Sequence, residues 1–533
     1  MRGYARPTHR SLRLTALAAL VALAGAALVA CGGSSGAGSS ASPAPAPTPA
    51  ASPMTLKVME LNIEYGGTQV SFAKVVQAVK AASPDVIGLE EAETNTSRLA
   101  KAAGYPYWSN SMQVVSRYPL LEPPAAGGSY LLVQVQPGFG VALANVHLPS
   151  DAPGPTMIRK GKTAEQVIAS ETKVRLPYIQ RQLEVLPPLA EQGIPVFLLG
   201  DFNAPSHLDY TAATAGTRDY VKYPLEWPVS KAVEAAGFID SWRAVYPDPV
   251  ANPGLTWWAA RPRVDGWNPG PRAPQDRIDF VYAAGPAQAT AAQLAGEKGG
   301  PEVAFAVQPW PSDHRGVLAT FSVTPGSLPV MVAAAPQVAT VGDQVTAYYK
   351  AAPSGAAAVA VVPVGGAPAD ALESPAVPAG AAAAGSAQVP TQALDPGDYE
   401  LLLVGAGGEV QARAPFWVQA SGSKPVLTTD KTTYSSGEPI IVTWKNAPAN
   451  RWDWLGVYKA GAADPSVDYY LIWQYTGGAG SGTSAGTVAG SMTMEQGAVE
   501  GKPWPLPPGR YVLYYLLADG YETAAKTTFT VTE

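Results

Sequence analysis

Oxygen-bearing and imidazole side chains recur at the ends of short apolar runs between residues 55 and 323. Taken singly, each of them could be a turn former or a helix cap. Several together point to one site, because loops at strand ends commonly assemble ligand sites and Mg²⁺ prefers a few oxygen ligands plus substrate phosphate. An imidazole and carboxylates also suit proton transfer during ester hydrolysis. The group comprises Asn62, Glu91, His147, Asp201, Asn203, Asp279, Asp313 and His314.

Composition excludes several other kinds of chemistry. The 533 residues contain one cysteine, Cys31, so an intramolecular disulfide, a cysteine zinc cluster and a Cys-x-x-Cys redox pair are ruled out. A formal net charge of −6 gives no support for a broad electropositive surface that grips nucleic acid. With 47% hydrophobic and 15% charged residues, the sequence is not that of a charged, disordered chain.

The elements that must position the polar residues alternate between strand and helix patterns. Ser71 is a candidate cap for a helix whose apolar face is formed by residues spaced three and four apart. Residues 173–186 also predict a helix. Strands are predicted at 55–63, 85–90, 140–146 and 195–199. This alternation is typical of an α/β domain.

After residue 326 the sequence changes to short Val/Thr/Tyr strands and Pro-Gly turns, and it contains an internal repeat. Residues 341–353 align with 436–448, and residues 394–399 align with 506–511. We therefore expect two all-β, immunoglobulin-like sandwiches, divided near Gly422. Trp452 and Trp454 are either core residues or part of a surface that binds carbohydrate.

The N-terminal segment has the pattern of an export signal. Four arginines precede the uncharged run 14–30, which ends in Leu-Val-Ala before Cys31. This junction resembles the lipobox of bacterial lipoproteins, which implies lipidation of Cys31 and a position in the cell envelope, facing the exterior or the periplasm. An ordinary cleaved signal and an uncleaved membrane anchor are the alternatives. Residues 32–53 are rich in Gly, Ser, Pro and Ala, as in a tether.

Seven motifs, in order, resemble the endonuclease/exonuclease/phosphatase family. That family includes deoxyribonucleases, apurinic endonucleases, inositol-polyphosphate phosphatases and neutral sphingomyelinases. The resemblance implies a four-layer α/β/β/α sandwich and a phosphoesterase that uses Mg²⁺, with Mn²⁺ or Ca²⁺ as alternatives. The motifs are Glu60–Ile63, Pro84–Glu91, Val115–Pro119, Asn145–Leu148, Gly200–Asn203, Arg277–Phe280 and Ser312–His314.

The resemblance also implies a role for each matching side chain. Asn62 and Glu91 match the metal ligands of the family, and Asp313 matches the position that completes or approaches the metal site. Asp201 and Asn203 match the pair that orients the attacking water and contacts the phosphate.

The remaining matches concern the imidazoles. His314 matches the catalytic histidine, Asp279 the carboxylate that orients it, and His147 a second phosphate-facing histidine. The sequence departs from the family at Glu90, where many members have Gln. An additional carboxylate beside Glu91 could change metal affinity.

These observations predict five segments: a lipoprotein signal peptide, a linker, a phosphoesterase domain and two β-sandwich repeats. Their bounds are 1–30, 31–53, 54–325, 326–421 and 422–533. The expected activity is that of a membrane-anchored phosphodiesterase acting on extracellular nucleic acid.

Two other functions remain open. A phospholipase C-like or sphingomyelinase-like hydrolase would act on a phospholipid headgroup. A non-catalytic lipoprotein would use its sandwiches to bind surface glycan or protein. Six tryptophans between the Asp-x-Asn and Ser-Asp-His motifs fit either core packing or a substrate platform, and they are Trp227, Trp242, Trp257, Trp258, Trp267 and Trp310.

Overall fold

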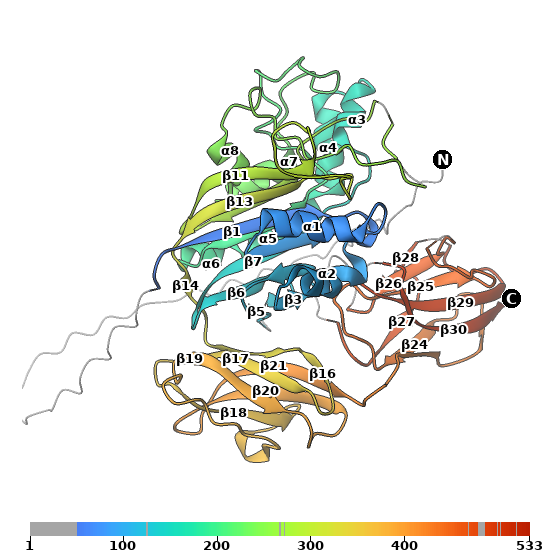
Figure 1. Ribbon diagram of the computed structural model, residues 1–533. Helices are drawn as coiled ribbons and strands as arrows, with labels where there is room; N and C mark the ends of the chain where they lie inside the picture. Colours follow the sequence, from blue (N-terminus) through green and yellow to red (C-terminus); the bar gives the residue numbers. More distant parts are fainter. Residues whose placement is uncertain are drawn as a thin grey trace, which may run out of the picture.

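The computed structural model describes residues 51–533 apart from 124–125, 266–267, 271, 467, 478–485, 498, 502 and 519. Its first half is built on two β-sheets (Figure 1). The first sheet has the spatial order β12 (Val303–Val307), β11 (Ala287–Glu297), β13 (Gly316–Val323), β1 (Met54–Asn62), β2 (Val86–Glu90), β4 (Val114–Ser116) and β3 (Tyr107–Ser109). The second has the order β5 (Leu120–Leu121), β6 (Leu131–Gln136), β7 (Phe139–His147), β8 (Val196–Asp201), β10 (Asp279–Ala284) and β9 (Ile239–Asp240), and β14 (Gly326–Ser327) pairs with β7.

The two sheets pack face to face through apolar side chains. Leu56 of β1 and Leu143 of β7 belong to the same buried cluster. Within it, the rings of Phe197 and Phe321 meet edge to face with their centres 4.9 Å apart. Alternate residues of these strands point into this layer because side chains alternate across a strand.

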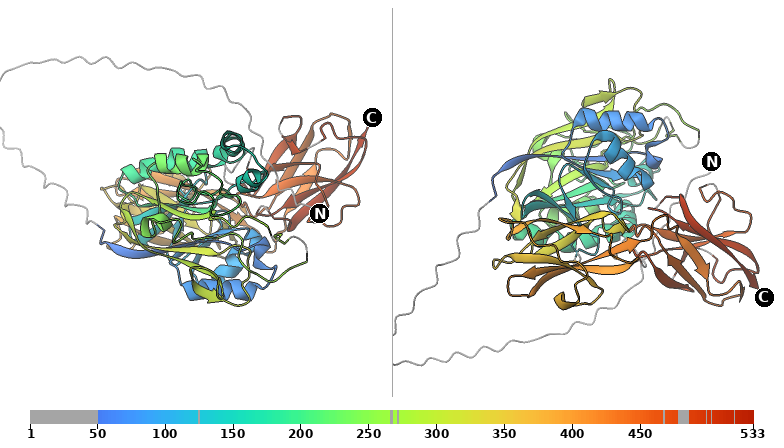
Figure 2. Two further views of the ribbon diagram at one scale, coloured as in Figure 1. Left: turned by 90° about the horizontal axis from the view of Figure 1, so that it is seen from above. Right: turned by 60° about the horizontal axis from the view of Figure 1, so that its bottom comes forward.

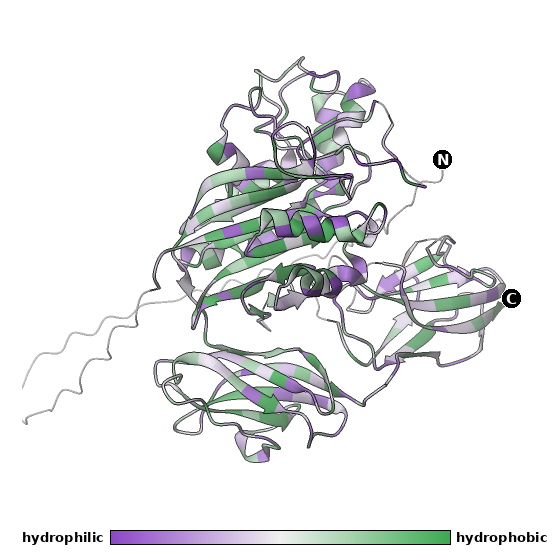
Figure 3. Cartoon of the chain, viewed as in Figure 1, coloured by the Kyte–Doolittle hydropathy of each residue, from purple (hydrophilic) through white to green (hydrophobic). Residues whose placement is uncertain are grey.

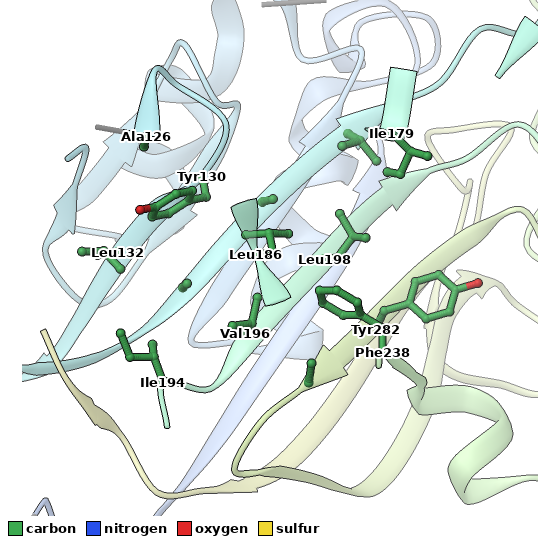
Figure 4. Packing of buried hydrophobic residues seen from close by; sticks show 14 of the residues in the cluster. Ala126, Tyr130, Leu132, Ile179, Leu186, Ile194, Val196, Leu198, Phe238 and Tyr282 are labelled. Carbon is green, nitrogen blue, oxygen red and sulfur yellow. The ribbon is translucent and has the colours of Figure 1, made fainter. Parts of the chain in front are cut away.

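Helices cover the outer face of each sheet. Outside the first sheet lie α1 (Phe72–Ala82) and α2 (Thr96–Ala103); Figure 3 shows hydrophobic and hydrophilic stretches along α1. The second sheet is covered by α5 (Leu176–Val185), α6 (Pro187–Glu191) and α7 (Pro228–Ala235). Figure 4 shows Ile179 and Leu186 packing toward Leu198 of β8. The order helix, sheet, sheet, helix is the predicted four-layer sandwich. The remaining helices are α3 (Gly154–Arg159), α4 (Ala164–Val174) and α8 (Ser241–Val245).

The helix predicted over 173–186 is present as α5, but it begins at Leu176, three residues later than predicted. The α4 helix ends at Val174, Arg175 with φ −115° separates the two helices, and Pro177 lies in the first turn of α5. Proline has no N–H to bond to the preceding turn, and its ring crowds that turn, so the chain starts a new helix there.

Strand pairing brings the predicted site residues to one edge of the sandwich. β1 and β2 run parallel, with Asn62 beside Glu90. β7 and β8 also run parallel, with His147 beside Asp201. Asp279 begins β10 and pairs with Asp201 in antiparallel register. The site therefore stands on the ends of strands from both sheets.

The C-terminal half is predominantly β, and we divide it into two units (Figure 2). The first β unit, residues 331–419, pairs β15 (Met331–Ala335), β17 (Gln344–Lys350) and β19 (Ala384–Pro390) in one sheet and β16 (Val338–Thr340), β21 (Val410–Gln419), β20 (Gly397–Gly405) and β18 (Ala356–Pro363) in another. The second β unit, residues 426–532, pairs β22 (Val426–Thr429), β24 (Ile440–Lys445) and β27 (Gly490–Met494). Its other sheet has the order β23 (Thr433–Ser435), β30 (Thr523–Thr532), β29 (Gly509–Leu516), β25 (Trp454–Lys459), β26 (Ile472–Tyr475) and β28 (Glu500–Gly501).

Equivalent hydrogen bonds occur at aligned positions of the two units. The hydroxyl of Tyr399 donates to the carbonyl of Asp395 at 2.8 Å, and that of Tyr511 donates to the carbonyl of Pro507 at 2.5 Å. Both tyrosines lie near the start of the central strand of their sheet. The aligned residues thus have the same place in each unit, while the immunoglobulin-like class stays a prediction.

The predicted N-terminal signal peptide, Cys31 and most of the linker lie outside the described residues. Among the helices of the described part, none has both the length and the apolar character that a membrane span requires.

The segment after β13 leads out of the domain formed by the first two sheets and also packs on it. Gly326 pairs with Gly140 of β7, and the Leu328 amide donates to the Gly138 carbonyl at 2.9 Å. The Leu328 side chain is buried in the same cluster as Leu198. This contact joins the beginning of the C-terminal half to the outer face of the second sheet.

Replacing Leu328 with alanine should lower the free energy of unfolding by about 2–5 kcal/mol, because it leaves a cavity in a closed cluster. Leu328 is 3% exposed, whereas the neighbouring Val330 is 44% exposed. Val330→Ala is therefore the control and should change the free energy by no more than about 0.5 kcal/mol. Urea unfolding of both variants measures the difference, and equal effects would contradict the packing described above.

Candidate active site

Asp201 lies at the centre of the assembled polar residues. Its Oδ2 atom accepts hydrogen bonds from the side-chain amides of Asn62 and Asn203, both at 3.2 Å. The backbone amide of Asn203 donates to Oδ1 at 2.8 Å. The Nε2 atoms of His147 and His314 lie 3.5 and 3.7 Å from Oδ2. Two sheets thus bring two amides and two imidazoles around one buried carboxylate.

His314 is held by a second carboxylate on the opposite side of its ring. Its Nδ1 atom lies 2.9 and 3.1 Å from the two carboxylate oxygens of Asp279. Burial lowers the pKa of His314, but the carboxylates of Asp279, Asp201 and Asp313 outweigh it and raise the pKa well above its ordinary value. The structure therefore favours an imidazolium whose Nε2 faces Asp201.

A short loop fixes the position of His314. The Ser312 hydroxyl donates to the carbonyl of Asn62 at 2.6 Å and accepts from the amide of His314 at 3.0 Å. The Trp310 indole donates to the carbonyl of His314 at 2.7 Å. These bonds tie the Ser-Asp-His motif to the end of β1.

Glu91 approaches Asn62 from the end of β2. Its Oε1 accepts from the Asn62 side chain at 3.3 Å, and its Oε2 accepts from the amide of Tyr65 at 3.1 Å. Glu91 and Asn203 have positive φ values of 54° and 49°, a conformation that costs about 1–3 kcal/mol for a residue other than glycine. The surrounding fold therefore holds both side chains in strained backbone positions.

The donor set fits a hard divalent cation. The groups on Asp201, Asp279 and His314 lie within 4.8 Å of one another, but a protonated His314 bonded to Asp279 fits a catalytic role and not that of a metal ligand. Burial, together with the neighbouring Glu91 carboxylate, raises the pKa of Asp313, while His314 lowers it. Burial, followed by the charge of Asp279, raises the pKa of Asp201 to about 7. Crowded buried carboxylates require a compensating positive charge, and oxygen ligands suit Mg²⁺, Mn²⁺ or Ca²⁺.

Residues 59–314 match the profile of the Endonuclease/Exonuclease/phosphatase family. The match covers just under half of the chain and supports a domain of this type there. A Caenorhabditis elegans protein, "Uncharacterized protein F14F9.5", is 29% identical over 251 residues, which cover 43% of this chain and 79% of that protein.

Two solved structures are also similar to this chain. An endonuclease/exonuclease/phosphatase from Beutenbergia cavernae is 17% identical, with a TM-score of 0.30, covering 68% of this chain and 99% of that one. D. rerio TDP2 complexed with a single-strand DNA product is 16% identical, with a TM-score of 0.31, covering 50% and 99%. These scores are too low to support an argument about substrate.

The endonuclease/exonuclease/phosphatase domain contains supporting residues that the sequence motifs did not indicate. Two guanidinium nitrogens of Arg261 donate to the two carboxylate oxygens of Glu64, both at 2.6 Å. Glu64 in turn accepts from the amide of Asp313 at 3.1 Å. The Trp257 indole donates to the Asp313 carboxylate at 3.2 Å. Arg261, close to Trp257 in sequence, was the one sign of such a contact. Its partner Glu64 lies 197 residues away in the chain, so the pair could not be predicted.

A pair of buried carboxyl groups lies beneath the site. Glu60 and Glu90 are on the neighbouring strands β1 and β2, and both are at most 1% exposed. Burial raises the pKa of Glu90 to about 8 and that of Glu60 well above its ordinary value. Near neutral pH, Glu90 is therefore mostly uncharged. In charge it then resembles the Gln that many family members have at this position.

The six tryptophans between the Asp-x-Asn and Ser-Asp-His motifs have different surroundings. Trp227, Trp242 and Trp310 are buried core residues. Trp257 is half-buried, and the centre of its ring lies 6.4 Å from that of His314. Trp258 is half-buried too, and Trp267 lies outside the described residues. Core packing thus explains three of them, while Trp257 is part of the site.

Proposed function

We propose that the chain is a divalent-metal-dependent hydrolase of phosphodiester bonds. The observation that supports this most directly is the position of Asp201 between His147 and His314, with His314 held by Asp279. A carboxylate that faces two imidazoles suits an attacking water on one side of a phosphoryl group and charge stabilisation on the other.

In the proposed reaction, Asp201 accepts a proton from the attacking water, whose orientation also depends on Asn203. The water oxygen forms a bond to phosphorus, and the bond from phosphorus to the leaving oxygen breaks. The leaving oxygen then takes a proton, and an alcohol and a phosphomonoester result. His314, kept protonated by Asp279, and His147 lie where they can donate to the non-bridging oxygens, on which charge accumulates.

Asn62, Glu91 and Asp313 are the residues that would hold the cation. When bound, a divalent metal neutralises charge on the phosphoryl oxygens. The oxygen donors of these side chains, and the position of Glu91 Oε1 only 3.3 Å from the Asn62 amide, support this assignment.

We propose extracellular nucleic acid as the substrate. The test is hydrolysis by the chain without residues 1–53 of single-stranded DNA, RNA, sphingomyelin and bis(p-nitrophenyl) phosphate, each with Mg²⁺, Mn²⁺, Ca²⁺ or EDTA. Metal-dependent cleavage of DNA or RNA supports the proposal. Cleavage of sphingomyelin alone favours the lipid hydrolase, and no cleavage of any substrate by the folded protein favours a binding function.

We also propose that Cys31 is acylated and attaches the chain to the cell envelope. Labelled palmitate should enter the wild-type chain and be absent from Cys31→Ala, because the sequence offers no other thiol. The acyl chains on Cys31 would provide the membrane attachment. The variant that lacks them should therefore move from the membrane fraction to the soluble fraction. Equal labelling of the two proteins would rule the proposal out.

A further inference from the structure

A cavity of about 170 Å³ adjoins the candidate active site and is lined by two parts of the chain. On one side are residues of the endonuclease/exonuclease/phosphatase domain, including Glu91, His147 and Tyr65. The other side belongs to the second β unit. Four of its aromatic residues line the cavity; Trp454 is buried, and we call the other three, Trp452, Tyr475 and Tyr521, the aromatic wall. Figure 1 shows this unit beside α2.

Contacts on both sides of the aromatic wall fix the second β unit in place. Arg451 is 4% exposed, and its Nη1 atom lies 3.2 Å from the sulfur of Met112. Gly128 makes room for it, because a Cβ atom there would lie 2.6 Å from Nη1. On the other side, the Thr94 hydroxyl donates to the Glu522 carboxylate at 2.5 Å. The cavity is therefore a defined feature between two packed surfaces.

The aromatic wall has a fixed orientation. The ring centres of Trp452 and Tyr475 are 5.3 Å apart, with their planes at 65°. The guanidinium of Arg451 lies 5.1 Å from the centre of the Trp452 ring. Trp452 is nevertheless only half-buried, and it lines the cavity. A ring held by its neighbours in this way can bind another flat group with little loss of side-chain entropy.

The charges around the cavity argue against a second phosphate there. Among the described residues that line it, Arg451 is the sole lysine or arginine, and its side chain is buried in the contact with Met112 and Gly128. Glu91, Glu93 and Asp151 also line the cavity. A phosphate inside the cavity would be repelled, whereas an uncharged ring with polar edges can stack on an aromatic residue and bond to the amides and hydroxyls of Gln113, Gln182 and Ser150.

We propose that the second β unit completes the substrate site, and that Trp452 binds a flat, uncharged ring attached to the scissile phosphate. This inference rests on the proposed phosphodiesterase function. A nucleobase and a sugar share the required chemistry. A base can enter the cavity only when it is unstacked, so the site favours single strands and chain ends over duplex.

The test uses Trp452→Ala, Trp452→Phe and the control Tyr469→Ala in the otherwise unchanged chain. Tyr469 belongs to the same β unit, is 63% exposed and does not line the cavity. Each protein is assayed on the p-nitrophenyl phosphodiesters of thymidine, glucose and methanol. The methyl ester has the same leaving group and no ring on the other side.

We expect Trp452→Ala to raise KM for at least one ring-bearing ester by roughly fivefold to a hundredfold, with kcat and the methyl ester little changed. Trp452→Phe should restore most of the loss, and Tyr469→Ala should match the wild type. The ester that responds identifies the ring as a base or a sugar. An equal change on all three esters, or no change in the thymidine and glucose esters, overturns the inference. Failure of the wild type to hydrolyse any of them instead contradicts the proposed function.

Discussion

Replacing His314 with alanine should lower kcat per folded molecule at least about a hundredfold, whatever stability is lost with the Asp279 interaction. The variant loses the imidazolium that faces Asp201, and with it the charge that stabilises the phosphoryl oxygens in the transition state. Steady-state kinetics and urea unfolding on the same preparation measure the two quantities. Normal turnover in the variant would end the catalytic assignment. A lowered stability with unchanged turnover per folded molecule would show that the residue is structural.

Asp279→Asn separates positioning of His314 from a structural role. The pKa of His314 is raised in the folded state, so the ring stays protonated at pH values above the ordinary histidine pKa of about 6.5. The interaction thus stabilises the folded protein fully below that pH, and its contribution is lost as the pH rises through the raised pKa. Activity should follow the same protonation and fall on the alkaline side.

Asparagine can still form a hydrogen bond to the ring, but it has no charge to favour the imidazolium. We therefore expect a smaller loss of kcat than in His314→Ala and an alkaline limb of the pH profile that moves to lower pH. A profile identical to that of the wild type would contradict the role of Asp279.

Glu91→Gln should weaken binding of the divalent cation by roughly a hundredfold, because it keeps the shape of the side chain and removes the charge. Activity should fall steeply at low metal concentration and recover partly when the concentration is raised. A titration of activity against Mg²⁺ or Mn²⁺ measures the shift.

Glu90→Gln is the matched control, since it makes the same chemical change one residue earlier. Glu90 is buried, and its pKa is raised to about 8 mainly by burial, so the substitution removes little charge at neutral pH. Its metal titration should stay close to that of the wild type. A larger effect at residue 90 than at residue 91 would show that the ligand has been assigned to the wrong carboxylate.

Local patterns in the sequence were sufficient to predict many of the strands and helices of residues 54–325. Alternation of apolar and polar residues predicted the strand that the structure places at Met54–Asn62. The spacing of the apolar residues after Ser71 predicted α1. The polar residues meet because β1, β2, β7 and β8 end at one edge of the sandwich, where the antiparallel strands β10 and β13 begin. The break at Arg175 was missed because the helix periodicity outweighed the single proline that follows it.

The features that depend on distant parts of the chain could not be derived in this way. Glu64 and Arg261 form an ion pair, but neither residue belongs to a strand pattern that would bring them together. Trp452 was open to a core or a surface interpretation, and its position in the cavity depends on how the second β unit packs. A sequence pattern predicts which face of a strand or helix is buried. It does not predict which distant part of the chain packs against that face.

The direction of β1 places the first described residues and the active site at opposite ends of one strand. Met54 pairs with Val323 at the beginning of the strand, and Asn62 reaches the active site at its end. At roughly 3.3 Å per residue, the nine residues separate these two points by about 27 Å. With Cys31 acylated as proposed, the chain would leave its supporting membrane at one end of the domain and open its cleft at the other. Substrates arriving from the surrounding medium would then reach the cleft more easily than lipids of the membrane that carries the protein.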